Sequence, residues 1–285
     1  MNSGLAQSLS SIGLAAVTSG AILVLGRLAF NRSQYFGGYI SIWALSVGYF
    51  VGCWVLFGIP TFPPGEGSYW LVWFLLAISL FGRMGQMRQV SWFHWILRGG
   101  TLSISIVLQF LQMPAHEWIL CQGVYCIVGL VASCLFFWWA IEKLIERTTS
   151  IESVMVWLLY SIMIGLLVVF LGELRLGQGL AILASCLVIL WIGTILGLRS
   201  INLKLLMPVV VIALSFPVQH MILNNEMTLV SAACLLVAPC ASWAAVRWLD
   251  VRKAWLRILV LATVVTLVCG IAVAWSISHL SEGSY

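Results

Sequence analysis

Residues 151–173 read IESVMVWLLYSIMIGLLVVFLGE, and no charged residue lies between Glu152 and Glu173. A helix needs about 20 mostly apolar residues to cross the hydrocarbon core of a bilayer. This segment has that length and is rich in Leu, Ile, Val and Met. We therefore predict a transmembrane helix here, and the same pattern recurs in both directions along the chain.

The composition of the whole chain agrees with this prediction. Of its 285 residues, 62 % are hydrophobic and 8 % are charged, and the mean hydropathy is +1.08. A soluble domain carries about 25 % charged residues. Membrane-spanning β-barrels show segments of about ten residues with alternating polarity, whereas the apolar runs here are long and continuous. We predict an all-α, polytopic transmembrane helical bundle.

Runs between charges and turn residues predict about ten helices in a single transmembrane domain, residues 1–285. The third is expected to be short, and the segment 60–68 before it holds three prolines that exclude a helix. The expected ranges are 8–30, 36–59, 69–82, 91–113, 117–141, 151–173, 178–198, 203–223, 228–247 and 255–279.

The basic residues predict the orientation. If the N-terminus is outside the cytoplasm, alternation over ten helices puts all 14 basic residues except Arg175 on the cytoplasmic side, as the positive-inside rule requires. We expect a multi-pass protein of the bacterial inner (plasma) membrane with both termini non-cytoplasmic. No basic residue precedes the first apolar stretch, which argues against a cleaved signal peptide.

The sequence lacks the motifs of several function classes. It has no HExxH, GxSxG, Walker or dinucleotide-binding motif and no CxxC among its eight cysteines. We expect no cofactor, no catalytic residues and no metal site, and we consider an enzyme less favoured than a non-enzyme. The net charge of +5 comes from dispersed basic residues and does not indicate nucleic-acid binding. The expected partners are the lipid bilayer and other membrane proteins.

Polar residues gather near the predicted outer helix ends. Ionisable groups at such positions are costly and often functional, so we treat these residues as candidates for substrate binding. The alternative is that they are helix-end groups in contact with water, with Glu173 and Arg175 as a local pair. The candidates are Gln109, Gln112, His116, Glu117, Gln122, Glu173, Gln219 and His220.

The basic segment 142–150 divides the chain into halves 1–141 and 151–285 with five predicted helices each. An odd number of helices per half gives the halves opposite orientations, as in inverted-repeat transporters. Pro208, Pro217 and Pro239 interrupt the eighth and ninth helices. The count of five plus five resembles the drug/metabolite transporter superfamily, which is usually described with cytoplasmic termini, opposite to our orientation.

Two pairs of small residues, Gly48 with Gly52 and Gly193 with Gly197, predict close helix packing. The stretch from Gly48-Tyr-Phe-Val-Gly52 through Phe62-Pro-Pro64 to Trp70 resembles a pattern in uncharacterised bacterial integral membrane proteins. This resemblance covers about the first 80 residues and implies no activity.

Three hypotheses on function follow. The first is a carrier of a small polar molecule or lipid intermediate, and the second is a non-catalytic subunit or scaffold of a larger membrane complex. The third, a membrane-embedded enzyme using His116, Glu117 or His220, has the least support because no catalytic motif accompanies these residues.

Overall fold

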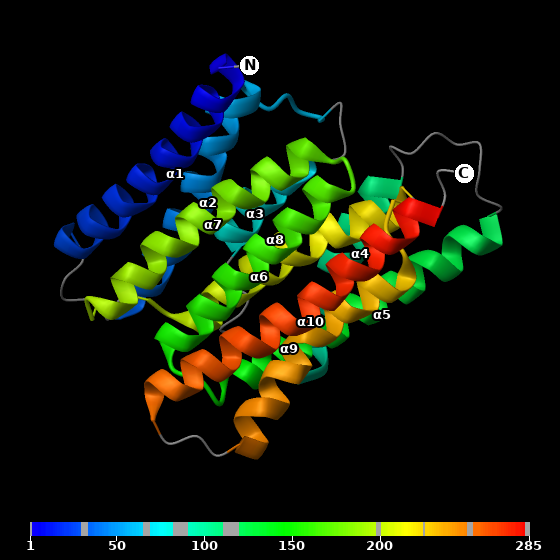
Figure 1. The fold of residues 1–285 in the computed structure, drawn as a ribbon. Helices are drawn as coiled ribbons and strands as arrows, with labels where there is room; N and C mark the ends of the chain where they lie inside the picture. The colour runs from blue at the N-terminus through cyan, green and yellow to red at the C-terminus, as the bar shows by residue number, and fades with distance from the viewer. Residues whose placement is uncertain are drawn as a thin grey trace.

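The computed structural model describes residues 2–29, 34–64, 69–81, 91–110, 120–197, 201–224, 226–249 and 253–282. Every regular element of more than one turn in these ranges is an α-helix (Figure 1). The ten helices are α1 (Asn2–Ala29), α2 (Gln34–Phe57), α3 (Trp70–Phe81), α4 (Ser91–Phe110), α5 (Leu120–Ile145), α6 (Ser150–Phe170), α7 (Leu174–Ile195), α8 (Leu203–Leu223), α9 (Leu229–Leu249) and α10 (Ala254–Glu282).

The polytopic helical bundle predicted from the sequence is confirmed. Eight of the helices are long and apolar enough to cross a membrane; α3 is apolar but has only 12 residues, and α4 is not among the eight. Several predicted ends differ from the observed ones. Helix α5 was expected to end at 141 but continues past its first charged residue, Glu142, to Ile145, and Lys143 in its last turn is paired with Glu146.

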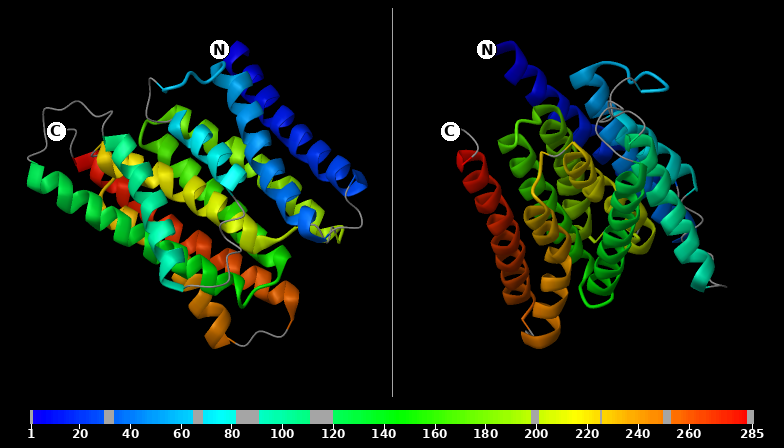
Figure 2. Two further views of the ribbon diagram at one scale, coloured as in Figure 1. Left: turned by 180° about the vertical axis from the view of Figure 1, so that it is seen from behind. Right: turned by 90° about the vertical axis from the view of Figure 1, so that its right-hand side faces the viewer.

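Helix α8 forms the centre of the bundle. It packs against α2, α3, α4, α5, α6 and α9, and 83 % of its most apolar stretch is buried, against 22 % for α1 and for α10. Helices α1 (blue) and α10 (red) lie on opposite flanks of the bundle in Figures 1 and 2. Polar residues of α8 are therefore enclosed by protein, whereas most side chains of α1 and α10 lie at least partly on the outer surface of the bundle.

Successive helices run in opposite directions, so the bundle has two chemically different ends. One end carries most of the described basic residues, and we call it the basic end: Arg27, Arg98, Lys143, Arg147, Lys204, Arg247, Lys253 and Arg257. The other carries Glu173 and Glu226 and is called the carboxylate end; α1 begins and α10 ends there (Figure 1).

Small residues bring α2 close to its neighbours, as Gly48 and Gly52 predicted. A Cβ atom on Gly48 would lie 2.0 Å from the Ser19 Oγ of α1, and one on Gly52 would lie 2.6 Å from the Ile182 Cγ2 of α7. The Ser19 hydroxyl donates to the carbonyl oxygen of Ala44 at 2.8 Å. Close backbone approach and an interhelical hydrogen bond thus hold α1, α2 and α7 together.

The proline in α9 has a specific compensation. Pro239 has no N–H, so the carbonyl of Leu235, four residues earlier, loses its helical hydrogen bond. The buried hydroxyl of Tyr160 in α6 donates to this carbonyl oxygen instead. An unsatisfied carbonyl within a bilayer costs several kcal/mol, so Tyr160 offsets the cost of the interruption and joins α6 to α9.

Corresponding pairs of helices pack together in the two halves. In the first half α1 packs against α2 and α4 against α5; in the second, α6 packs against α7 and α9 against α10. The third helix of each half differs in length: α3 has 12 residues and α8 has 21. The relation of the halves by an inverted repeat stays a prediction.

Candidate functional site

Two glutamine side chains meet in the interior beside the central helix. Gln109 of α4 and Gln219 of α8 are 2 % and 1 % exposed, and the Gln109 Nε2 donates to the Gln219 Oε1 at 3.1 Å. The Gln219 Nε2 donates to the Ser215 Oγ at 3.3 Å and to the Cys134 Sγ of α5 at 3.0 Å. The amides therefore link three helices in a buried network, the glutamine pair.

The glutamine pair retains an open acceptor. Among the residues that the structure describes, the buried Gln109 Oε1 has no hydrogen-bond partner. Leaving a buried acceptor unpaired costs about 1–3 kcal/mol, so such an atom is a place where a bound molecule with an N–H or O–H group gains free energy.

The glutamine pair lies beside a proline inside α8. Pro217 falls between Ser215 and Gln219 and withholds an N–H from the carbonyl of Ala213. The sequence predicted that prolines interrupt the eighth and ninth helices, but both helices run through their prolines without a break. What Pro217 leaves is one backbone carbonyl without its helical N–H partner, next to buried polar side chains.

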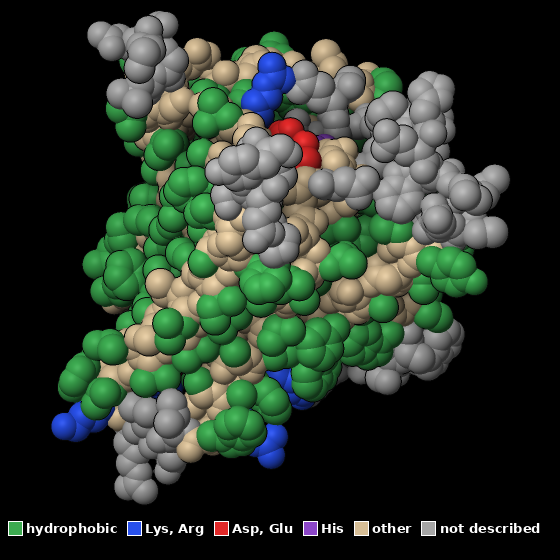
Figure 3. Space-filling view, turned by 45° about the vertical axis from the view of Figure 1, so that its right-hand side comes forward, with side chains coloured by type: hydrophobic (Ala, Val, Ile, Leu, Met, Phe, Trp, Pro, Cys, Tyr) green, Lys and Arg blue, Asp and Glu red, His purple; other side chains and the backbone are tan. Residues whose placement is uncertain are grey.

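A second cluster, Glu173, His220 and Glu226, lies at the carboxylate end. The side chain of Glu226, in the loop after α8, is hydrogen-bonded to that of Glu173. The buried Oε2 of Glu226 has no hydrogen-bond partner among the described residues. His220 is near enough to Glu173 to interact with its charge, and its ring is stacked on Phe216 with the centroids 6.5 Å apart. Figure 3 shows acidic and histidine side chains gathered at this end.

Burial raises the pKa of the Glu226 carboxyl from 4.5 to about 7, and the charge of Glu173 and the hydrogen bond between the two carboxyls add to this effect. Two neighbouring carboxylates resist ionising together, so the pair favours sharing one proton. The carboxylate cluster can therefore take up and release a proton near neutral pH.

This pKa predicts how stability depends on pH. The folded protein holds a proton on Glu226 that the unfolded chain releases near pH 4.5, so folding loses stability as the pH rises from about 4.5 to about 7. We expect the melting temperature of the detergent-solubilised protein to fall over this range, and to fall less in Glu226→Gln. The matched variant Glu146→Gln, at the basic end, should keep the slope of the wild type. Equal slopes in all three proteins would contradict the assignment of the raised pKa to Glu226.

The structure separates the predicted candidates into groups. It brings Gln109 to Gln219 in the interior and Glu173 to His220 at the carboxylate end. Four candidates lie wholly or in their side chains outside the described residues: Gln112, His116, Glu117 and the side chain of Gln122.

Glu173 does not close α6 as the sequence indicated. Helix α6 ends at Phe170, Gly172 has a φ of +98°, and Glu173 is the N-cap of α7.

Sequence reasoning left out Ser105, Cys134, Ser215 and Glu226 as site residues. A signal for two of them was present, because Ser105 precedes Gln109 by four residues and Ser215 precedes Gln219 by four. Residues four apart share a helix face, so each pair marks a polar strip on an otherwise apolar helix. Ser105 also donates to the Gln219 Oε1 at 3.3 Å.

Within the described part of the chain, no three or more His, Cys, Asp or Glu residues are grouped so that they could hold a metal ion. The candidate site consists of a buried amide network beside α8 and a carboxylate cluster at the end of that helix, in a polytopic integral membrane protein. No protein-family model, curated protein or solved structure matches this chain.

Proposed function

We propose that this protein is a carrier that moves a small polar molecule across a membrane. The observation that supports it is the glutamine pair: buried amides with an open acceptor, beside the proline-containing helix at the centre of the bundle. A purely structural network gains most when every polar atom is paired. An open acceptor fits a ligand that completes the network.

The carboxylate cluster supports a role for protons in this transport. Its histidine, His220, directly follows Gln219 on α8, and a pKa near 7 at Glu226 lets the cluster change charge in the physiological range. Proton relays in carriers use carboxyl and imidazole groups in this way. We propose that proton release from the cluster accompanies solute movement past the glutamine pair.

The orientation is part of the proposal. Because basic residues favour the cytoplasmic side, we place the basic end in the cytoplasm of a bacterial cell and the carboxylate end outside. A reporter enzyme that is active only outside the cytoplasm, fused to the C-terminus, tests this placement: an inactive fusion would reverse the two ends.

The packing favours a second candidate, a non-catalytic subunit of a larger membrane complex. Two pockets lined by described residues have free volumes of about 20 and 10 Å3, which leaves room for at most one or two water molecules in each. A carrier must open further than this to pass a solute, whereas a scaffold need not. Purification in a mild detergent separates the two, because a stoichiometric partner protein supports the subunit.

Transport by variants tests the carrier. We expect proteoliposomes with the wild-type chain to take up at least one labelled solute from a panel of carboxylates, phosphate, sugars and quaternary amines. Gln219→Leu, Glu173→Gln and His220→Ala should each lower that uptake about tenfold or more, because each removes a group in the proposed path.

The control is Gln178→Leu, which removes a glutamine bonded at 3.1 Å to Ser8 of α1, away from the proposed path. It should transport like the wild type. Uptake that survives in Gln219→Leu, or is lost equally in Gln178→Leu, would refute the assignment of the glutamine pair.

A further inference from the structure

The amide hydrogens of the glutamine pair are all engaged within the network. The Gln109 Nε2 donates to the Gln219 Oε1 at 3.1 Å and to the Ser105 carbonyl oxygen at 3.3 Å. The Gln219 Nε2 donates to the Ser215 Oγ and to the Cys134 Sγ. A side-chain amide has two N–H donors, so neither glutamine has an N–H left for a ligand.

The open position of the pair is an oxygen, because the Ser105 carbonyl fixes the orientation of the Gln109 amide. A backbone carbonyl only accepts hydrogen bonds, so the nitrogen of the amide has to lie beside it. The Gln109 Oε1 is then the buried atom without a partner among the described residues. A ligand at the glutamine pair therefore has to donate a hydrogen bond, which an ionised carboxylate group cannot do.

Carboxyl groups lie at the end of α8, next to the glutamine pair. His220 follows Gln219 directly on this helix. Its ring interacts with the charge of Glu173, and the carboxyl of Glu173 is hydrogen-bonded to that of Glu226. Removing an ion from water is costly unless a counter-charge compensates it. The carboxylate cluster supplies that counter-charge for a cation that approaches the glutamine pair from the carboxylate end.

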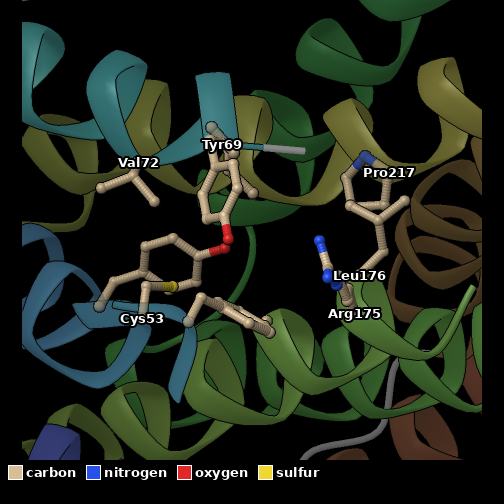
Figure 4. Close-up of a pocket in the computed structure, with 10 residues that line it drawn as sticks. Cys53, Tyr69, Val72, Arg175, Leu176 and Pro217 are labelled. Atoms are coloured by element: carbon tan, nitrogen blue, oxygen red, sulfur yellow. The ribbon is translucent and has the colours of Figure 1, made fainter. Parts of the chain in front are cut away.

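The basic side chain described at this end lies on another side of the central helix. Arg175, in the first turn of α7, lines a cavity with Tyr49, Tyr69 and Pro217 (Figure 4). Pro217 and Gln219 are two residues apart, which is about 200° around a helix, so the cavity and the glutamine pair lie on nearly opposite sides of α8. The other described basic residues named above lie at the basic end. The charges beside the glutamine pair thus favour a cation.

Aromatic rings lie beside the same stretch of α8. The ring of Phe216 is stacked on that of His220 with the centroids 6.5 Å apart, and its centroid lies 6.3 Å from that of Phe74 in α3. Phe216 precedes Gln219 by three residues, so the two are neighbours on the helix surface. The faces of aromatic rings attract cations, which adds to the effect of the carboxyl groups.

We propose that the solute recognised by the glutamine pair is a protonated primary amine, whose ammonium group donates a hydrogen bond to the Gln109 Oε1. This inference rests on the proposed function, because it names the class of solute that the carrier moves. An ammonium group has three donors and no acceptor, which complements a site with an open acceptor and no open amide donor. Hydrogen bonds from charged donors are about twice as strong as neutral ones.

Equilibrium binding to the full chain in nanodiscs of zwitterionic lipid tests the inference with three labelled probes of similar size. Ethanolamine carries the ammonium group, ethylene glycol has a hydroxyl in its place, and glycolate has a carboxylate. We expect saturable binding of ethanolamine that is about tenfold or more tighter than that of the other two probes. Nanodiscs without the protein measure the background.

The variant Gln109→Leu removes the open acceptor and should weaken the binding of ethanolamine about tenfold or more. The matched control is Gln178→Leu, which removes the glutamine bonded to Ser8 and should bind ethanolamine like the wild type. The comparison of the three probes uses the wild type alone, so it decides the inference even if Gln109→Leu does not fold.

Four results overturn the amine assignment: no saturable binding, equal binding of ethylene glycol and ethanolamine, tighter binding of glycolate, or unchanged binding of ethanolamine in a folded Gln109→Leu. Uptake of an uncharged or anionic solute that depends on Gln219 would then leave the carrier standing with another class of solute. Binding of ethanolamine that depends on Gln109, without uptake into proteoliposomes, would instead keep the amine site and refute the carrier.

Discussion

Replacing Glu152 by alanine is expected to lower the free energy of unfolding by about 3 kcal/mol. Glu152 stands in the first turn of α6 with its side chain 1 % exposed, and its Oε1 accepts a hydrogen bond of 2.7 Å from the Arg257 Nε of α10. Its Oε2 accepts from the Thr149 backbone N–H at 2.8 Å in a capping box. Alanine therefore leaves Arg257 without its counter-charge and removes part of the helix cap.

This expected loss in the free energy of unfolding is at the lower end for a broken buried ion pair, because Arg257 is 25 % exposed and water can partly solvate it. Unfolding by SDS titration, followed by the fluorescence of the 15 tryptophans, measures the change. The matched control is Glu146→Ala: its pair with Lys143 has a similar separation, 2.8 Å, but both side chains are more than one-third exposed. We expect less than about 1 kcal/mol there, and equal losses in the two variants would refute the argument.

Replacing Gly48 by leucine is expected to destabilise the bundle by about 3 kcal/mol or to prevent folding. A Cβ atom at this position would lie 2.0 Å from the Ser19 Oγ, 3.0 Å from the Ala15 carbonyl oxygen and 3.1 Å from the Cys186 Sγ. Ser19 can rotate only by giving up its hydrogen bond to Ala44, and the Ala15 carbonyl belongs to the backbone of α1. Helices α1, α2 and α7 would have to separate.

The control for this variant is Gly129→Leu in α5, where a Cβ atom meets nothing within 4 Å. Leucine there gains helix propensity of less than about 1 kcal/mol and faces open space. Thermal unfolding of both variants in the same detergent measures the difference in their stability. A Gly48→Leu protein as stable as Gly129→Leu would show that α1, α2 and α7 are not packed as described.

The number and type of the helices could be predicted from the sequence because each span is a local property. A run such as 203–223 is apolar over its whole length, and a bilayer leaves a helix as the way to satisfy its backbone. The observed α8 matches this range at both ends. Other helix ends differ by a few residues, as at α7, which was expected over 178–198 and begins at Leu174.

The candidate site was predictable only in part. Gln109 and Gln219 were identified as polar residues near helix ends, with substrate binding and contact with water as the two interpretations. They are buried because α8 is surrounded by six other helices, and hydropathy along one helix carries no information on its neighbours. The raised pKa of Glu226 depends on burial and on Glu173, which lies in another loop, and neither is visible in the local sequence.

By itself, the sequence determined that this protein is a membrane-embedded bundle of about ten helices with its basic residues gathered at one end, because hydropathy and charge act on each segment separately. Only the tertiary structure decided that α8 is central, that Gln109 meets Gln219, and that Tyr49, Tyr69 and Arg175 border one cavity. These contacts join residues far apart in the chain, and they depend on how the apolar helix surfaces fit one another, which no single segment encodes.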